Sequence, residues 1–264
     1  MFITMKIRAI MVAAGAFALL SSGMTSAYAY PVSDAPDLTN NSLYTAGKLP
    51  EAACAKKPAK GKTMASVTKH VNAVISCLND TWGSYLKEAN LQFVPTLVEM
   101  TGKYTSDCRG RTLNPKKSAV FYCGGHANFI VQIRSDWLKA SDDVQIFAQL
   151  SSAYGEHVLN MVDIAEAYNA LHADDGTEMS EQLRRYNLQA QCISGVTAKS
   201  LWPALGYPAK DAKRLAELAK AGAGKSKIDI FGKGVNLAYW FNRGYSTGDP
   251  KSCNTWTAPS GKVA

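Results

Sequence analysis

Histidine is scarce in this chain, and its spacing excludes one common kind of metal site. Only four histidines occur in 264 residues, and no two of them lie four residues apart. Two histidines at that spacing face one ion, because four residues advance a helix by little more than one turn. The sequence therefore lacks the two-histidine helical motif of zinc enzymes. It also lacks a Cys-x-x-Cys pair, so we expect neither a cysteine–zinc site nor a catalytic thiol.

Long hydrophobic runs are scarce as well. The apolar run at residues 9–20 follows the basic residues Lys6 and Arg8 and precedes the small residues Ala27 and Ala29. This order is typical of a secretory signal, with cleavage expected before Tyr30. A membrane anchor is the weaker interpretation, because a spanning helix needs roughly 18–20 apolar residues. We therefore expect a secreted, extracellular or cell-envelope protein whose mature chain has no transmembrane segment.

The net charge is positive but modest. It is +8 at pH 7, and removing the two basic residues of the signal from the 29 in the chain leaves 27 against 21 acidic ones, or +6. Such a charge would suit an anionic cell surface, although a solubilising charge without a dedicated partner is the favoured interpretation. The densest basic cluster has no interleaved aromatic residues, so we expect no nucleic-acid partner. We interpret this cluster first as a solvated loop and second as a contact patch; it comprises Lys56, Lys57, Lys60 and Lys62.

Six cysteines in a chain expected to be exported predict three disulfides. Six cysteines allow fifteen pairings, and the sequence does not choose among them. The simplest arrangement joins neighbours in chain order, as Cys54–Cys77, Cys108–Cys123 and Cys192–Cys253.

Hydrophobic periodicity predicts an α+β fold that is mainly helical with a small sheet. Two β-rich runs, at 118–123 and 128–133, are separated by a glycine-containing turn and indicate a hairpin or paired edge strands. Apolar residues recur at helical spacing over 64–80, 143–171, 178–200, 211–221 and 233–245.

The length of the mature chain favours one domain over two. Residues 1–29 are the expected signal peptide. Residues 30–60 lack a clear period, and we interpret them as an extended, loosely docked arm that could cover a cleft. A single domain is expected over 61–258, followed by a tail at 259–264.

Four blocks of sequence, in this order, carry a resemblance to a known family. They are AVFYCGGHANFIVQ at 119–132, FAQLSSAYGEHV at 147–158, RYNLQAQCISG at 185–195 and YWFNRGYSTGDPKSCNTW at 239–256. The chain resembles the bacterial neutral zinc metallopeptidases, a gluzincin-like group of secreted or membrane-attached proteins. The resemblance implies a zincin-like metallopeptidase scaffold, with the small sheet packed beside a degenerate His-Glu-x-x-His helix. It also implies a bridge between Cys192 and Cys253.

The same resemblance places the family's zinc site on residues that differ from its motif. The first ligand histidine falls on Ser152, the catalytic glutamate on Ala153 and the second ligand histidine on Glu156. The third ligand, the glutamate of the family's Glu-Leu-Gln-Ala-Asp motif, falls on Asn187, and the aspartate of that motif falls on Gln191. The surrounding frame is retained: Tyr154, Gly155, His157, Leu188, Gln189, Ala190, Cys192 and Gly195.

These replacements remove the chemistry that the resemblance implies. A catalytic zinc needs three protein ligands and a water. Ser152 and Asn187 are neutral, and only Glu156 carries a charge. Without zinc a water keeps a pKa far above 7, and Ala153 cannot accept its proton. We therefore expect no bound zinc or other cofactor, and an exported pseudopeptidase that binds a peptide, a protein or the cell surface.

Two alternatives remain open. The first is an active metallopeptidase or hydrolase with a metal site rebuilt near Glu156 and His126. In that reading His157 is a further weak candidate, although we expect it to be a packed histidine, and His70 and His172 to face solvent. The second alternative is a structural protein of the cell envelope.

If a cleft persists, four aromatic side chains could line it, although ordinary core positions explain them as well. They are Tyr154, Tyr186, Phe231 and Trp240.

Overall fold

The structure, a computed structural model, describes residues 32, 34–103, 108, 110, 113–222 and 230–264. The expected signal peptide and its cleavage site lie outside these residues. The helices are α1 (Pro36–Thr39), α2 (Met64–Glu88), α3 (Ser135–Lys139), α4 (Val144–Met161), α5 (Ile164–Asn169), α6 (Gly176–Ala204), α7 (Lys213–Gly222) and α8 (Gly234–Thr247). The strands are β1 (Leu97–Thr101), β2 (Ala119–Cys123) and β3 (Asn128–Gln132). The mainly helical α+β class is confirmed.

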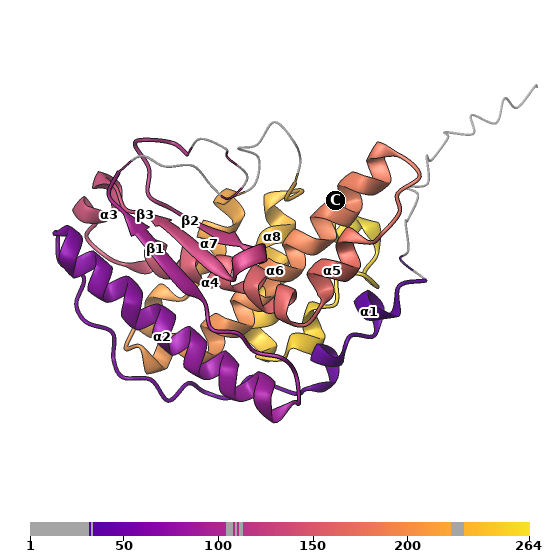
Figure 1. Cartoon of the computed structure of the whole chain (residues 1–264), viewed down its shortest axis with the longest axis horizontal. Coiled ribbons are helices and arrows are strands. Elements are labelled where there is room, and N and C mark those ends of the chain that lie inside the picture. Colours follow the sequence, from indigo (N-terminus) through magenta and orange to yellow (C-terminus); the bar gives the residue numbers. More distant parts are fainter. Residues whose placement is uncertain (1–31, 33, 104–107, 109, 111–112, 223–229) are drawn as a thin grey trace, which may run out of the picture.

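The sheet contains the predicted hairpin and one strand that the sequence did not predict. β2 and β3 pair antiparallel, and a short 3-10 turn at Gly124–His126 joins them. β1 pairs parallel to β3 on its other side, which gives the order β1-β3-β2. In Figure 1 the three strands lie together at one end of the molecule, with α2 running beside them. β2 packs on α4, and α4 also contacts α2, so the sheet covers one side of α4.

α4 is the central helix, and the structure shortens it relative to the prediction. Its side chains Phe147, Leu150, Tyr154 and Val158 recur at helical spacing and are fully buried. The expected helix over 143–171 is interrupted, because Asp163 adopts a left-handed conformation with φ 62° and separates α4 from α5.

α4, α6 and α8 pack with their backbones in close contact. A Cβ added at Gly155 on α4 would collide with the carbonyl oxygen of Ala190 on α6. A Cβ at Gly195 would meet the carbonyl of Phe241 on α8, and a Cβ at Gly244 would meet that of Cys192. These positions need glycine because the helices approach closely there. Close packing of the three helices fixes the positions of the side chains between them.

The segment before α2 is not the loosely docked arm that the sequence suggested. Leu38 and Leu43 are fully buried, and Tyr44 is 7% exposed. The Tyr44 hydroxyl donates to the Leu38 carbonyl at 3.0 Å and accepts from Gln189 on α6 at 2.7 Å. The tail is docked as well, since Val263 is fully buried. Both segments lacked a helical period, but their apolar side chains are part of the core.

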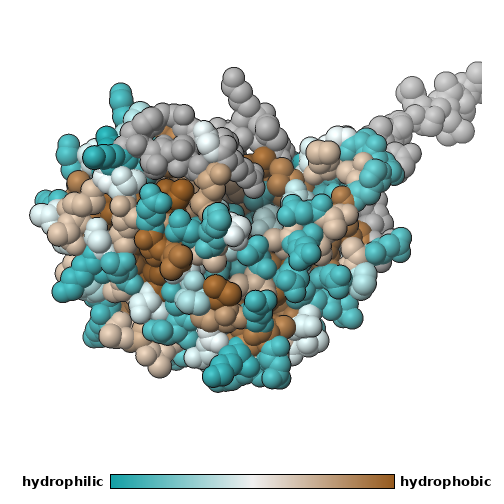
Figure 2. Space-filling view, viewed as in Figure 1, coloured by the Kyte–Doolittle hydropathy of each residue, from teal (hydrophilic) through white to brown (hydrophobic). Residues whose placement is uncertain are grey.

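The structure pairs the cysteines in the simplest order, so the predicted three disulfides are confirmed. The Cα–Cα distances are 5.5 Å for Cys54–Cys77, 5.7 Å for Cys108–Cys123 and 5.4 Å for Cys192–Cys253. The third bridge ties α6 to the segment after α8. In the described part of the chain, no helix has the length and apolar character needed to cross a membrane. Figure 2 shows hydrophilic and hydrophobic residues interspersed over one face.

Candidate functional site

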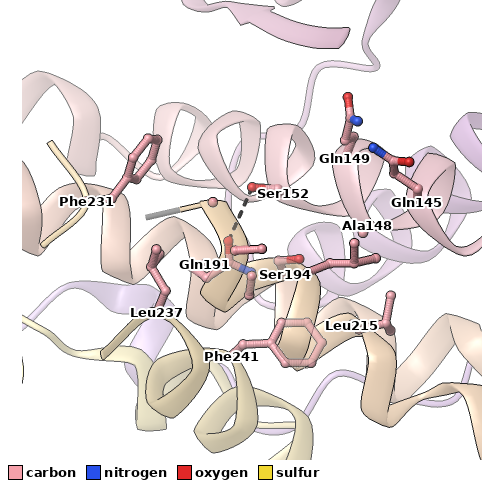
Figure 3. Close-up of a pocket in the computed structure, with 14 residues that line it drawn as sticks. Gln145, Ala148, Gln149, Ser152, Gln191, Ser194, Leu215, Phe231, Leu237 and Phe241 are labelled. Atoms are coloured by element: carbon pink, nitrogen blue, oxygen red, sulfur yellow. Dashed lines mark hydrogen bonds between the residues drawn. The ribbon is translucent and has the colours of Figure 1, made fainter. Parts of the chain in front are cut away.

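The facing sides of α4 and α6 bring the motif positions together. Oγ of Ser151 lies 2.9 Å from Oγ of Ser194, and Oγ of Ser152 donates to Oε1 of Gln191 at 3.5 Å. Because residue numbers rise along α4 as they fall along α6, the two helices run antiparallel here. Glu156, one turn after Ser152, is therefore on the side of α4 that faces Asn187, one turn before Gln191. Figure 3 shows Ser152 and Gln191 pointing toward each other.

Asn187, at the third ligand position, is engaged in holding the backbone. Its Nδ2 group donates to the Leu183 carbonyl at 2.9 Å and to the Ile230 carbonyl at 2.8 Å. The first bond stays within α6, whereas the second fixes the residue immediately before Phe231. A carboxylate at this position could not donate either bond. Asn187 therefore joins α6 to the chain that leads into α8.

The residues at the motif positions do not fit a catalytic zinc. Ser152 offers a neutral hydroxyl, Asn187 has its amide hydrogens directed at carbonyls, and Ala153 is a buried methyl group. Zinc requires imidazole, thiolate or carboxylate donors, and only Glu156 supplies one. Across the described ranges, no three His, Cys, Asp or Glu side chains gather at a common point.

His157 is a packed histidine, and both of its ring nitrogens are engaged. Nδ1 lies 3.0 Å from the Tyr122 hydroxyl, and Nε2 lies 2.9 Å from the Val94 carbonyl. A carbonyl oxygen only accepts, so Nε2 carries the proton and Nδ1 accepts from Tyr122. Burial lowers the pKa of His157 to about 4, against the smaller opposing effect of the bond to Val94. Neither nitrogen has a lone pair directed at Glu156 or at a metal.

Of the other three histidines, His126 and His172 are exposed, whereas His70 is buried, contrary to the sequence interpretation. His126 is exposed in the turn between β2 and β3, and His172 is exposed as expected. His70, which we expected to face solvent, is fully buried. Its Nδ1 lies 3.0 Å from the Pro58 carbonyl, and its Nε2 lies 3.5 Å from the Asp143 carboxylate. The Tyr207 hydroxyl lies 3.4 Å from the same Nε2, so three separate segments surround His70, and no local pattern reveals that.

The lysine cluster is also partly internal. Nζ of Lys57 lies 2.7 Å from the Asp143 carboxylate. Nζ of Lys60 donates to the Trp137 and Ala140 carbonyls at 3.0 and 2.9 Å. Two of the four lysines are therefore used to attach this segment to α3 and α4, which leaves Lys56 and Lys62 as its exposed members.

A cleft of about 320 Å³ lies between α4, α6, α7 and α8, and Ser152 and Gln191 form part of its wall. Figure 3 shows Phe231, Leu237 and Phe241 along one side of it. Its polar side chains are all neutral: Gln145, Gln149, Ser152, Gln191 and Ser194. Its other described lining residues are Ala148, Leu215, Leu218, Ala219, Ala221, Gly222, Phe231, Leu237 and Phe241.

Of the four aromatic residues proposed for a cleft, only Phe231 lines this one. Tyr154 is fully buried, and its hydroxyl lies 3.0 Å from Oδ1 of Asn79. Trp240 is 3% exposed and donates to the Lys262 carbonyl. Tyr186 stacks on Tyr168 with ring centroids 5.0 Å apart. Tyr154 and Trp240 are therefore core residues, as the alternative interpretation had it.

Sequence reasoning missed most of the cleft lining, although one signal was present. Gln145, Gln149 and Ser152 recur at helical spacing along α4, which is otherwise largely apolar. Polar residues on one stripe of a buried helix indicate a face that does not pack against the core. The apolar residues from α7 and α8 carry no such signal, because their spacing also fits core positions.

The retained motif residues have structural tasks. Gln189 bridges two ends of the chain, since its Nε2 donates to Tyr44 and its Oε1 accepts from Trp256 at 2.7 Å. Cys192 forms a disulfide, and Gly155 and Gly195 permit the helices to approach closely. The retained residues thus build the scaffold, whereas Ser152 and Gln191, which replace motif residues, line the cleft.

Comparisons with known proteins agree with the family resemblance. Residues 24–256 match the family described as "Putative neutral zinc metallopeptidase". The chain is similar to the uncharacterized protein YpfJ of Escherichia coli strain K12, with 24% identity over 207 residues that cover 71% of each chain. The YpfJ protein of Escherichia coli O6:H1 strain CFT073 gives the same values. No solved structure matches. The motif blocks and the family match over residues 24–256 show that the chain belongs to the neutral zinc metallopeptidase family.

Proposed function

We propose that this chain is an exported, non-catalytic member of its family that binds a peptide segment in the cleft between α4, α6, α7 and α8. The observation that carries the proposal is that the motif positions on the cleft wall hold neutral residues, Ser152 in place of a ligand histidine and Gln191 in place of an aspartate. Ser152 and Gln191 face each other there, and the Asn187 amide donates a hydrogen bond to the Ile230 carbonyl. This arrangement offers hydrogen bonds and apolar surface, but no activated water.

The lack of a general base at the motif position is the second chemical argument against hydrolysis. The position that matches the family's glutamate holds the methyl group of Ala153, which is 5% exposed. Attack on a peptide carbonyl needs a group that accepts the proton of the nucleophile, within about 3 Å of it. His157 does not serve, because its Nδ1 accepts from Tyr122 and its Nε2 faces a carbonyl.

Export is supported by the disulfides and by the order of residues in the first 29 positions. Three bridges are typical of proteins that fold outside the reducing cytoplasm. A peptide is favoured over an anionic surface as the ligand, since Lys57 and Lys60 make internal contacts. Clefts with apolar walls and a few polar groups are the usual form of ligand sites.

An immobilised library of random peptides tests the proposal on the mature chain, residues 30–264. We expect some peptides to be retained and recovered uncleaved by mass spectrometry. Leu218→Glu, which places a charge in the cleft wall, should abolish retention. Leu97→Glu is the matched control, because Leu97 is 67% exposed on β1, away from the cleft. Chelator-sensitive cleavage, or equal retention by both variants, would overturn the proposal.

A further inference from the structure

The charge of the cleft lining restricts what it can hold. None of its described lining residues is acidic or basic, although the chain carries 29 basic and 21 acidic residues. A charged group that enters such a cleft loses water and gains no counter-charge from the described lining, which is unfavourable. An uncharged occupant loses much less. The lining therefore discriminates against Lys, Arg, Asp and Glu side chains and against a free carboxylate.

The cleft has an apolar region and a polar region, so its occupant should carry both an apolar group and a polar group. Leu215, Leu218, Leu237 and Phe241 form an apolar region. Ser152 and Gln191 form a polar region, and Figure 3 shows Ser152 pointing from α4 toward Gln191. A volume of about 320 Å³ is at the small end for ligand clefts, so it suits one or two residues rather than a long segment.

The polar region complements a backbone amide better than a group that can only donate or only accept a hydrogen bond. Oε1 of Gln191 accepts from Ser152, which leaves the Nε2 end of the carboxamide as its donor. The Ser152 oxygen retains the capacity to accept. A donor and an acceptor on adjacent side chains complement the C=O and N–H of a peptide group.

We infer that the cleft selects an uncharged peptide segment with one leucine-sized apolar side chain, whose backbone amide meets Ser152 and Gln191. This inference rests on the proposed function and narrows it. The segment is internal to its chain or blocked at its end, because a free carboxylate would bring a charge into the neutral lining. Residues on either side remain outside the cleft.

Blocked tripeptides test the selectivity on the mature chain. The probes are acetyl-Ala-Leu-Ala-amide, the same peptide with Lys or Glu at the centre, and the leucine peptide with a free carboxylate. Binding is followed by NMR shifts of the labelled protein. We expect the leucine amide to shift signals from Ser152, Gln191 and Leu237, and the three charged probes to bind at least about tenfold more weakly.

An isosteric charge placed in the cleft provides the matched variant. Gln191→Glu keeps the acceptor for Ser152 but adds a negative charge. It should weaken the binding of acetyl-Ala-Leu-Ala-amide by about tenfold. Gln92→Glu makes the same change at an exposed position outside the cleft and should leave binding unaltered. Circular dichroism of both variants confirms that they fold.

The outcomes separate this inference from the proposal beneath it. Equal binding of leucine, lysine and glutamate probes, or no shift with any of them, overturns the inference. If the protein still retains library peptides and Leu218→Glu abolishes that retention, the proposal of peptide binding holds, although the proposed selectivity for uncharged segments does not. If the library is not retained either, both fail.

Discussion

Nδ1 of His157 accepts a hydrogen bond from the Tyr122 hydroxyl at 3.0 Å, which joins the motif helix to the sheet. On its other side, Nε2 donates to the Val94 carbonyl, in the segment that leads into β1. Burial lowers the pKa of His157 to about 4, so the imidazole is neutral at pH 7, and the bond to the Val94 carbonyl places its proton on Nε2. His157, next to Glu156, therefore fastens α4 to β2 and to the segment before β1.

This arrangement predicts a loss of stability in mild acid. The folded-state pKa of His157 is about 4, against 6.5 for an unperturbed histidine. Between these values the unfolded chain binds the proton and the folded chain does not, so stability is complete above pH 6.5 and falls as the pH drops toward 4. The full effect is about 3 kcal/mol. His70, whose pKa burial also lowers, adds to the fall.

Urea unfolding of the mature chain and of His157→Gln, at pH 7 and pH 4.5, measures the effect. The variant should be less stable at pH 7 and should lose less stability on acidification. His172→Gln is the control, because its imidazole is exposed and should leave the pH dependence as it is. The same pH dependence in the parent and in His157→Gln would contradict the assignment.

Gly155→Ala should destabilise the protein, although alanine favours helices. The new methyl group would collide with the Ala190 carbonyl and force α4 and α6 apart. Overpacking of this kind costs about 1–3 kcal/mol. Gly176→Ala is the control, because nothing lies within 4 Å of its Cβ position. Thermal unfolding of both variants tests the contact, and equal midpoints would show that the helices accommodate the group.

Arg185→Met should be strongly destabilising. The Arg185 guanidinium is 1% exposed, lies 2.6 Å from Glu181 and donates to the Ala258 carbonyl. Removing it leaves the Glu181 carboxylate buried without its partner, which costs about 3–5 kcal/mol. Arg214→Met is the matched control, because its pair with Asp142 is about half exposed and such pairs contribute about 0–1 kcal/mol. Denaturant unfolding measures the free energy of unfolding of both variants, and equal decreases would contradict this ranking.

Restoring the motif tests whether the scaffold still brings its positions together. Because Ser152 faces Gln191, the combined variant Ser152→His, Ala153→Glu, Glu156→His and Asn187→Glu should direct three zinc ligands at one point. We expect it to retain about one zinc per chain. The variant that keeps Asn187 lacks the third ligand and should retain less. Equal, negligible zinc in both would show that the helices no longer position these residues.

Local periodicity predicted much of the fold. The apolar face expected in 64–80 is buried in α2, and the runs at 118–123 and 128–133 form the expected hairpin. β1 was missed because its strand is short, its Leu97 is exposed, and its partner β3 lies about thirty residues away. The break at Asp163 was missed because an apolar period continues across it.

The site was harder to predict, because its walls come from four helices. Ser152 and Gln191 were found by their motif positions, and they do meet. Tyr154 and Trp240 lie in the core, which was the other interpretation of these residues, because periodicity does not distinguish a cleft wall from a core. His70 was placed in solvent because its partners, Pro58 and Asp143, are distant in sequence. Contacts between segments decide all three cases.

Metal analysis of the mature chain, after exposure to zinc and removal of the excess, tests the central claim most directly. With Ser152 and Asn187 at two ligand positions, we predict that the protein retains no zinc. About one tightly held zinc per chain, lost on Glu156→Ala or His126→Ala, would contradict the account and show that a metal site has been rebuilt.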